Sequence, residues 1–124
     1  MITTTERRSD LSHLVATNIE RDHWAAELEA FTRRNAGRLA SLEVDDPEMG
    51  AQPQEHDYPL LGAAWDRNDQ RVEIMLGDFV GVRRHLTRGI SGVTRIDILR
   101  DEAGRDWVLR IAHRPGQTIL TLQR

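Results

Sequence analysis

The hydrophobic period of this chain changes at Gly37, and that change limits the folds open to it. Before Gly37, apolar side chains recur at the spacing of a helix at Trp24, Leu28 and Phe31. After it, apolar and polar residues alternate as in half-buried strands, at Leu42 and Val44, at Val72, Ile74 and Leu76, at Ile96 and Ile98, and at Trp107, Leu109 and Ile111. One helix followed by a run of strands predicts an α+β fold.

The helix is predicted to run from about Asp22 to about Asn35. Asp22 lies in the first turn, where the positive end of the helix dipole favours a carboxylate. Glu29 and Arg33 form an i,i+4 pair in the favoured orientation. Gly37 supplies a residue that readily adopts the left-handed conformation and ends the helix. The beginning, the apolar face and the end therefore agree on one amphipathic helix.

Strand and turn patterns fill the rest of the chain. We predict strands at about residues 38–44, 52–57, 60–65, 71–76, 82–88, 94–100, 107–113 and 118–122. Pro53 confines the second of these to an edge, and Asp66 to Asp69 should form a hairpin turn. Pro115 and Gly116 occupy the centre of a predicted type II turn. The expected architecture is an N-terminal helix on a curved, mainly antiparallel sheet of about six to eight strands, which could close into a small barrel.

One domain accounts for the chain, because 124 residues with 39% apolar content can bury a core without a linker dividing them. We expect residues 19–124 to form this domain. Residues 1–18 are predicted to be an N-terminal arm, tail or short helix. In the helical alternative, one side would carry Leu11, Leu14, Val15, Asn18 and Ile19. The segment could then be a docked helix, a swapped arm or an extension that is ordered only in an oligomer.

The composition excludes several classes of function. Cysteine is absent, which excludes disulfides, thiolate metal sites and a cysteine nucleophile. No apolar run reaches the length of a membrane span, and the N-terminus lacks the apolar core of a secretory signal, so we expect a cytoplasmic location. All 17 basic residues are arginine and the net charge is -3. The missing lysine indicates the codon usage of a GC-rich bacterial genome more than a binding surface.

No segment carries a recognisable catalytic or cofactor motif, which favours a protein that is not an enzyme and holds no cofactor. The glycines at 77 and 81 lack the Gly-Lys-Ser/Thr of a phosphate-binding loop. Ser91 lies between Gly89 and Gly92 but lacks the spacing of a nucleophile elbow. The function is therefore expected to rest on binding.

Two alternative binding sites follow from clusters of polar residues. Arg83, Arg84 and Arg88, with Arg95 across the sheet, form a basic patch that could contact a nucleic-acid backbone, although charged edge strands also prevent aggregation. A small-ligand or metal site would need His56, His85 and His113 to converge, since zinc requires three or four ligands.

The chain resembles a small bacterial family known as domain of unknown function 5335. The resemblance rests on Ile19-Glu20-Arg21-Asp22-His23-Trp24, with Phe31 further on, on Pro59-Leu60-Leu61-Gly62 before Trp65-Asp66, and on Val72-Glu73-Ile74-Met75-Leu76-Gly77. It covers about residues 19–124 and implies no activity, cofactor or catalytic residue. A helix followed by a bent antiparallel sheet is also similar in topology to Sm-like RNA-binding barrels.

The leading hypothesis is a cytoplasmic bacterial accessory protein that acts by binding, as a homodimer and without catalysis of its own. A nucleic-acid binder and a small-ligand or metal-binding protein are the alternatives. No membrane association is expected.

Overall fold

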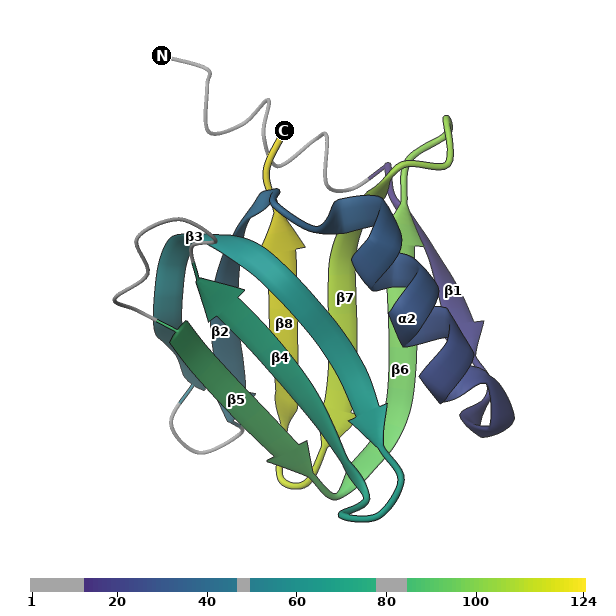
Figure 1. The fold of residues 1–124 in the computed structure, drawn as a ribbon, viewed down its shortest axis with the longest axis vertical. Helices are drawn as coiled ribbons and strands as arrows, with labels where there is room; N and C mark the ends of the chain where they lie inside the picture. The colour runs from purple at the N-terminus through teal and green to yellow at the C-terminus, as the bar shows by residue number, and fades with distance from the viewer. Residues whose placement is uncertain (1–12, 47–49, 78–84) are drawn as a thin grey trace.

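The computed structural model describes residues 13–46, 50–77 and 85–124, except for the side chains of residues 53–56. Figure 1 shows one helix lying against a strongly bent sheet. In chain order the elements are β1 (Val15–Ile19), the 3-10 turn η1 (Arg21–His23), α2 (Trp24–Asn35), β2 (Leu39–Asp46), β3 (Gly50–Asp66), β4 (Arg71–Gly77), β5 (His85–Ser91), β6 (Val93–Arg100), β7 (Asp106–His113) and β8 (Gln117–Leu122).

The described strands form one eight-stranded sheet in the order β1-β6-β7-β8-β2-β3-β4-β5. Every neighbouring pair is antiparallel. The prediction of a helix packed on a curved antiparallel sheet is confirmed. The prediction of a closed barrel is wrong for the described residues, because β1 and β5 lie at opposite ends of the strand order.

Strand β3 bends the sheet, because it changes its partner along its length. Its first half pairs with β2 from Gly50 to Pro59, and its second half pairs with β4 from Leu60 to Asp66. The separate strands predicted at residues 52–57 and 60–65 are therefore one strand. Asp57, with a φ of 57°, lies near the point where the partner changes.

Helix α2 packs beside the second half of β3. The Oγ1 atom of Thr32 accepts a hydrogen bond from Ala63 N at 2.9 Å and lies 2.9 Å from Ala63 O. Gly62 permits this approach, since a Cβ there would lie 3.2 Å from Thr32 Cγ2. A helix side chain thus covers the edge of β3 at Ala63 that faces away from β4.

The helix itself follows the sequence prediction closely. Residues 21–23 form the turn η1, and α2 then runs to Asn35, where the predicted segment ends. Gly37 has a φ of 91°, which confirms its role in ending the helix. No described helix has the length and apolar character needed to cross a membrane.

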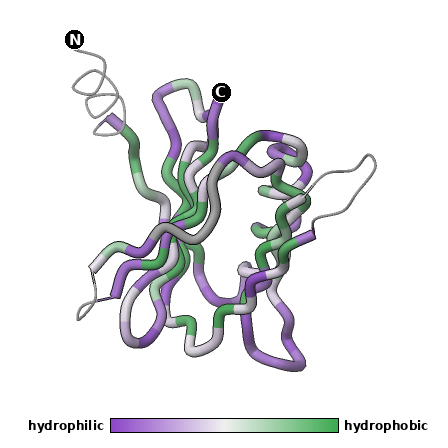
Figure 2. Tube along the Cα trace, turned by 90° about the vertical axis from the view of Figure 1, so that its left-hand side faces the viewer, coloured by the Kyte–Doolittle hydropathy of each residue, from purple (hydrophilic) through white to green (hydrophobic). Residues whose placement is uncertain are grey.

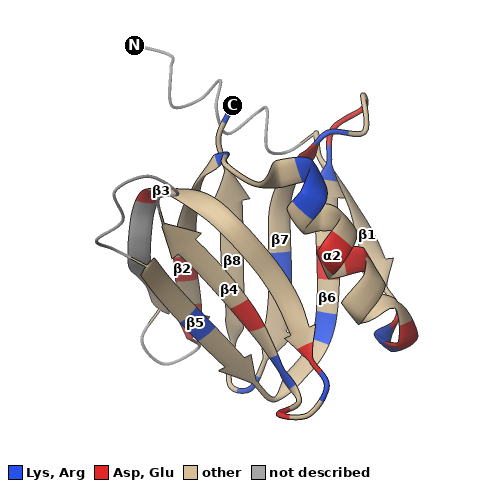
Figure 3. Ribbon diagram, in the orientation of Figure 1, with Lys and Arg blue, Asp and Glu red and all other residues tan. Residues whose placement is uncertain are grey.

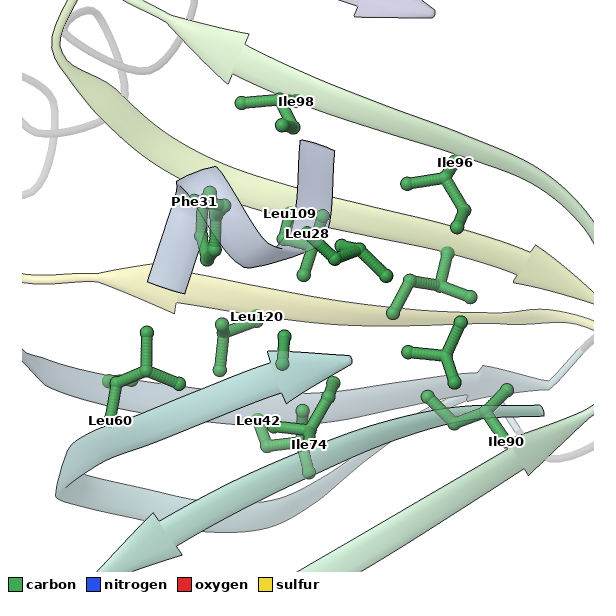
Figure 4. Packing of buried hydrophobic residues seen from close by; sticks show 14 of the residues in the cluster. Leu28, Phe31, Leu42, Leu60, Ile74, Ile90, Ile96, Ile98, Leu109 and Leu120 are labelled. Carbon is green, nitrogen blue, oxygen red and sulfur yellow. The ribbon is translucent and has the colours of Figure 1, made fainter. Parts of the chain in front are cut away.

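The core lies between α2 and the inner face of the bent sheet. Figure 4 shows Leu28 and Phe31 of α2 close to side chains from several strands, which are Leu42, Leu60, Ile74, Ile90, Ile96, Ile98, Leu109 and Leu120. Each fully buried side chain of this size contributes about 1.5–3 kcal/mol relative to exposure. Figure 2 shows that hydrophilic residues gather in the turns, outside this core.

The N-terminal segment contains a strand where a short helix was one prediction. Val15–Ile19 pairs antiparallel with β6, so the helical alternative is wrong for these residues. Val15, Thr17 and Ile19 are β-branched and alternate, and this pattern favours a strand. Ile19 is buried in the core. Residues 1–12 lie outside the described part of the chain.

Three smaller predictions also differ from the structure. Strand β5 continues to Ser91 instead of ending near Arg88, and the chain turns only at Gly92, whose φ is 69°. The turn predicted at Asp66 to Asp69 is shifted, because Asp66 still belongs to β3 and the turn extends to Gln70, whose φ is 53°. The type II turn is wrong, because Gly116 lacks the positive φ that such a turn requires.

Candidate functional site

A pocket of about 270 Å³ lies between the C-terminal end of α2 and the turn that joins β6 to β7. We call it the arginine pocket, and its lining residues are Arg34, Asn35, Arg38, Gly104, Arg105 and Asp106. Figure 3 shows basic positions on the last turn of α2 and in the neighbouring β6–β7 turn. The end of the helix at Asn35 places Arg34 and Asn35 over the first residue of β7, and the turn at Gly37 places Arg38 beside them.

Asp106 forms the inner wall of the pocket, and its side chain is only 2% exposed. Its carboxylate accepts hydrogen bonds from Arg34 Nε at 2.7 Å, Asn35 Nδ2 at 2.8 Å and Arg100 Nε at 2.8 Å. Burial alone would raise the pKa of Asp106, but these hydrogen bonds outweigh it and hold the pKa below its usual value. The carboxylate is therefore ionised at neutral pH, and it ties α2 to β6 and β7.

Arg38 is held by three hydrogen bonds, but one of its nitrogen atoms has no partner in the described part of the chain. Its Nε donates to Gln123 O at 3.0 Å, and its Nη1 donates to Asn35 Oδ1 at 2.9 Å and to Asp106 O at 2.7 Å. Its Nη2 is buried and has no hydrogen-bond acceptor among the described residues. Burial, and then the positive charge of Arg105, lower the pKa of Arg38. The structure thus holds a guanidinium group in place while one of its buried donors lacks a described acceptor.

Arg105 is fixed on the other side of the pocket by the β6–β7 turn. Asp101 Oδ1 accepts a hydrogen bond from Arg105 N at 2.9 Å, and Asp101 Oδ2 accepts one from Trp107 Nε1 at 2.8 Å. The guanidinium carbons of Arg105 and Arg38 lie 5.1 Å and 5.2 Å from the centre of the Trp107 ring. These cation–π contacts hold both arginine side chains in place. A ligand that binds them would therefore lose little free energy to the ordering of these side chains.

Positive charge exceeds negative charge around the pocket. The arginine groups that line it or bond to its lining are Arg34, Arg38, Arg100 and Arg105, and the carboxylates are Asp101 and Asp106. Arg34 and Arg100 both form salt bridges with Asp106. Arg38 and Arg105 form no salt bridge within the described part of the chain, so the carboxylates of Asp101 and Asp106 act on these two guanidinium groups only at longer range.

The basic patch predicted from the sequence is only partly described. Arg83 and Arg84 lie outside the described residues. Arg88 lies on β5, opposite Ile74 of β4. Arg95 lies on β6, which is not adjacent to β5 in the sheet, and its Nε is 3.0 Å from the buried Asp97. The structure therefore does not place Arg88 and Arg95 on neighbouring strands, and the patch stays a prediction.

The three histidines of the predicted metal site lie on three different strands. His56 is in β3, but its side chain is not described, while His85 begins β5 and His113 ends β7. The Nε2 atom of His113 lies 2.8 Å from Thr118 Oγ1. Among the described side chains, no group of three or more His, Cys, Asp or Glu residues could hold a metal ion. The site that includes His56 stays a prediction, which metal analysis of the purified protein would test.

The sequence motif at residues 19–24 has a structural role. Trp24 packs edge-on against Trp65 at a ring-centre distance of 5.0 Å, and its Nε1 donates to Ile19 O at 2.9 Å. Arg21 lies over both rings, at 4.8 Å from Trp24 and 5.4 Å from Trp65. These residues fasten the start of α2 to the end of β3, so we assign them to stability.

Sequence reasoning missed the arginine pocket. The sequence patterns single out none of Arg34, Arg38 and Asp106 as members of a site. One signal was present: Asn35 follows Leu28 and Phe31 on the apolar stripe of the helix and is buried. A polar residue at a core position requires hydrogen-bond partners, and here those partners are Asp106 and Arg38.

Comparison with known proteins identifies a family and no activity. A family model described as a family of unknown function (DUF5335) matches residues 15–119, from the start of β1 into β8. The resemblance inferred from the sequence is thereby confirmed. No curated protein and no solved structure matches the chain.

Proposed function

The chain belongs to this family of unknown function, DUF5335, and from that premise we propose that it is a non-catalytic binding protein whose arginine pocket recognises an anionic group. The proposal agrees with the sequence-based hypothesis of a protein that acts by binding. It moves the expected site from the β5 region to the end of α2.

One observation carries the proposal, which is the buried and unpartnered Nη2 of Arg38. A purely structural network accounts for Arg34 and Arg100, because both neutralise Asp106. It accounts less fully for Arg38 and Arg105, because Arg38 keeps one unpartnered donor beside its three hydrogen bonds and neither side chain forms a salt bridge within the described part of the chain. A buried donor without an acceptor costs about 1–3 kcal/mol, and a bound anion would remove that cost.

Anion-dependent thermal stability tests the proposal. A ligand that binds the folded state raises stability, by about 2.7 kcal/mol at a concentration of 100 times Kd. We expect sulfate to raise Tm more than chloride does at equal ionic strength. Arg105→Gln should remove the difference, while Arg33→Gln should keep it, because Arg33 on the same helix turn pairs with Glu29 outside the pocket. Equal sulfate effects in both variants would contradict the proposal.

Self-association through β1 is a second candidate function, and the character of this edge strand favours it. Val15–Ile19 contains no charged residue or proline, and Val15 is 64% exposed. Edge strands usually carry charge, a bulge or a cover against pairing, as Thr32 of α2 covers β3. An antiparallel pair of β1 strands centred on Thr17 would place Val15 opposite the partner's Ile19, and the resulting dimer would be two-fold symmetric.

Light scattering during size-exclusion chromatography tests the second candidate. We expect the full chain to elute as a dimer and Thr17→Lys to elute as a monomer, since the two-fold axis would bring two lysine charges together. Thr87→Lys, on the exposed side of β5, is the control and should remain dimeric. A monomeric full chain would remove the dimer proposal and leave the arginine pocket unaffected.

The nucleic-acid alternative uses Arg83, Arg84, Arg88 and Arg95, and a binding experiment separates it from the pocket. Binding to short single-stranded RNA should weaken steeply with salt, because contacts to phosphates release counterions. Arg88→Ala would weaken such binding and Arg105→Gln would spare it. The absence of binding at low salt would exclude this alternative.

A further inference from the structure

We propose that the anionic group recognised by the arginine pocket is a phosphate monoester in its dianionic form. This inference rests on the proposed function and specifies the class of ligand. Two observations support it. They are the net charge of the pocket and the three arginine residues from separate segments that line it.

The charge of the pocket matches a dianion. Arg34 and Arg100 share the single carboxylate of Asp106, and Arg38 and Arg105 add two more positive charges. Asp101 compensates part of this excess from the turn, where its carboxylate is occupied by Trp107 and by backbone N–H groups. The groups that line the pocket or bond to its lining thus comprise four guanidinium groups and two carboxylates. A monoanion such as a carboxylate would leave one positive charge uncompensated, whereas a phosphate monoester carries about −1.5 to −2 at neutral pH.

The donors also fit a phosphate in number. Arg34 belongs to α2, Arg38 to the connection between α2 and β2, and Arg105 to the β6–β7 turn. A terminal phosphate offers three oxygens, one for each guanidinium group, and a planar carboxylate offers two. Guanidinium groups bind phosphate oxygens with paired, charge-assisted hydrogen bonds. The existing bonds of Arg38 leave its buried Nη2 without an acceptor among the described residues.

The position of Asp106 explains how a dianion can approach a buried carboxylate. Arg34 donates to Oδ2 of Asp106 and Arg100 donates to Oδ1, so the two arginine side chains neutralise the carboxylate. Asn35 also donates to Oδ2. Its negative charge is therefore compensated before a ligand arrives. Arg34 lines the pocket and also holds Asp106 through Nε and Nη2, so its Nη1 is the one terminal nitrogen that these two bonds do not use. Asp106 is a positioning residue for the arginine groups and not a direct ligand contact.

The aromatic surroundings limit recognition to the phosphate itself. Trp107 is the indole beside the pocket, and the guanidinium groups of Arg38 and Arg105 already lie against its ring. Stacking of a nucleobase or another flat ring on Trp107 would compete with these two contacts. The shared chemistry of the ligand is thus a phosphate monoester, on either a small molecule or a phosphorylated side chain.

Isothermal titration of the full chain with three matched ligands tests the inference. Phenyl phosphate is a dianion near neutral pH, methyl phenyl phosphate keeps the phosphate but has one negative charge, and benzoate is a monoanionic carboxylate. We expect phenyl phosphate to bind at least about tenfold more tightly than the other two, which corresponds to about 1.4 kcal/mol. Equal affinities would overturn the dianion inference and leave the anion pocket standing, while no binding of any ligand would overturn both.

Two variants and two phosphoserine ligands complete the test. Arg105→Gln removes one positive charge from an exposed turn residue and should abolish the preference for phenyl phosphate, whereas Arg33→Gln should retain it. A preference that survives in Arg105→Gln would contradict the inference. Tighter binding of a phosphoserine peptide than of free O-phosphoserine would support a phosphorylated protein as the source, and equal binding would support a small phosphate monoester.

Discussion

The carboxylate of Asp106 lies 2.7 Å from Nε of Arg34, and this contact joins the last turn of the helix to the first residue of β7. The two residues are 72 positions apart in the sequence. Arg34 is partly exposed and reaches the surface at the pocket. Asp106 is almost fully buried and stabilises the interior.

Asp106→Asn should destabilise the protein substantially. The variant keeps the shape of the side chain but leaves Arg34 and Arg100 without their shared carboxylate. We expect a loss of about 2–3 kcal/mol in the free energy of unfolding, because charge-assisted hydrogen bonds to a buried group are lost. Solvent screens the exposed side of Arg34 and keeps the loss from being larger. Urea unfolding measures the loss. Glu29→Gln, which breaks the exposed pair with Arg33, is the control and should cost less than about 0.5 kcal/mol. Equal losses would contradict the prediction.

Acid should destabilise the protein through Asp97 and Asp106. Burial opposes ionisation of Asp97, but hydrogen bonds from Arg95, Asn18 and Arg110 lower its pKa below the usual value, and the pKa of Asp106 is lowered as well. A carboxyl group whose pKa is lower in the folded state gives stability that is complete above its unfolded pKa of about 3.9. That stability is lost as the pH falls through the lower, folded pKa.

The pH dependence can be measured by urea unfolding between about pH 6 and pH 2. Asp97→Asn should flatten the acid limb by up to about 1.4 kcal/mol per pH unit, the value for one proton. Glu102→Gln, in the exposed β6–β7 turn, should leave the limb unchanged. A wild-type limb that Asp97→Asn does not alter would show that this carboxylate does not govern acid stability.

Thr32→Val should weaken the attachment of the helix to β3. Valine has nearly the same shape as threonine but leaves the N–H and C=O of Ala63 without the hydroxyl that they contact. We expect a loss of about 1–3 kcal/mol by thermal or urea unfolding. Thr87→Val, on the exposed surface of β5, should change stability by less than about 0.5 kcal/mol. A stable Thr32→Val protein would mean that packing alone covers this strand edge.

Gly116→Ala should be strongly destabilising, because a Cβ at this position would lie 1.9 Å from Asp45 O of β2. Backbone atoms cannot move aside as a flexible side chain can, so the loss should reach or exceed the cost of about 1–3 kcal/mol that is typical of overpacking. Gly89→Ala is the control. Its Cβ would make an ordinary contact of 3.4 Å with the Arg71 side chain, and its stability should stay near that of the wild type. Comparable Tm values for the two variants would contradict the close approach of β8 to β2.

Local periodicity predicted most of the secondary structure because it acts over a few neighbouring residues. The apolar stripe of Trp24, Leu28 and Phe31 is buried as expected, and Gly37 ends the helix through its own backbone conformation. The alternation at Val72, Ile74 and Leu76 likewise predicted which side chains of β4 face the core. None of these features needs a distant partner.

The remaining features depend on contacts between distant segments. The strand at Val15–Ile19 requires the edge of β6, and the continuous β3 requires β2 at one half and β4 at the other. The covered edge at Ala63 requires Thr32 of the helix. The sequence could not distinguish an open sheet from a barrel, because closure depends on whether the distant strands β1 and β5 meet.

The sequence by itself determined that a helix precedes an antiparallel sheet and that their apolar faces form one core, because spacing along the chain fixes which side chains share a face. Only the tertiary structure decided that Arg34, Arg38 and Arg105 meet around Asp106. These residues come from three separate segments, and their convergence depends on the long-range packing of the helix end against the β6–β7 turn. The physical reason is that a charged pocket has no period in the sequence, since its members share no element and become neighbours only through folding.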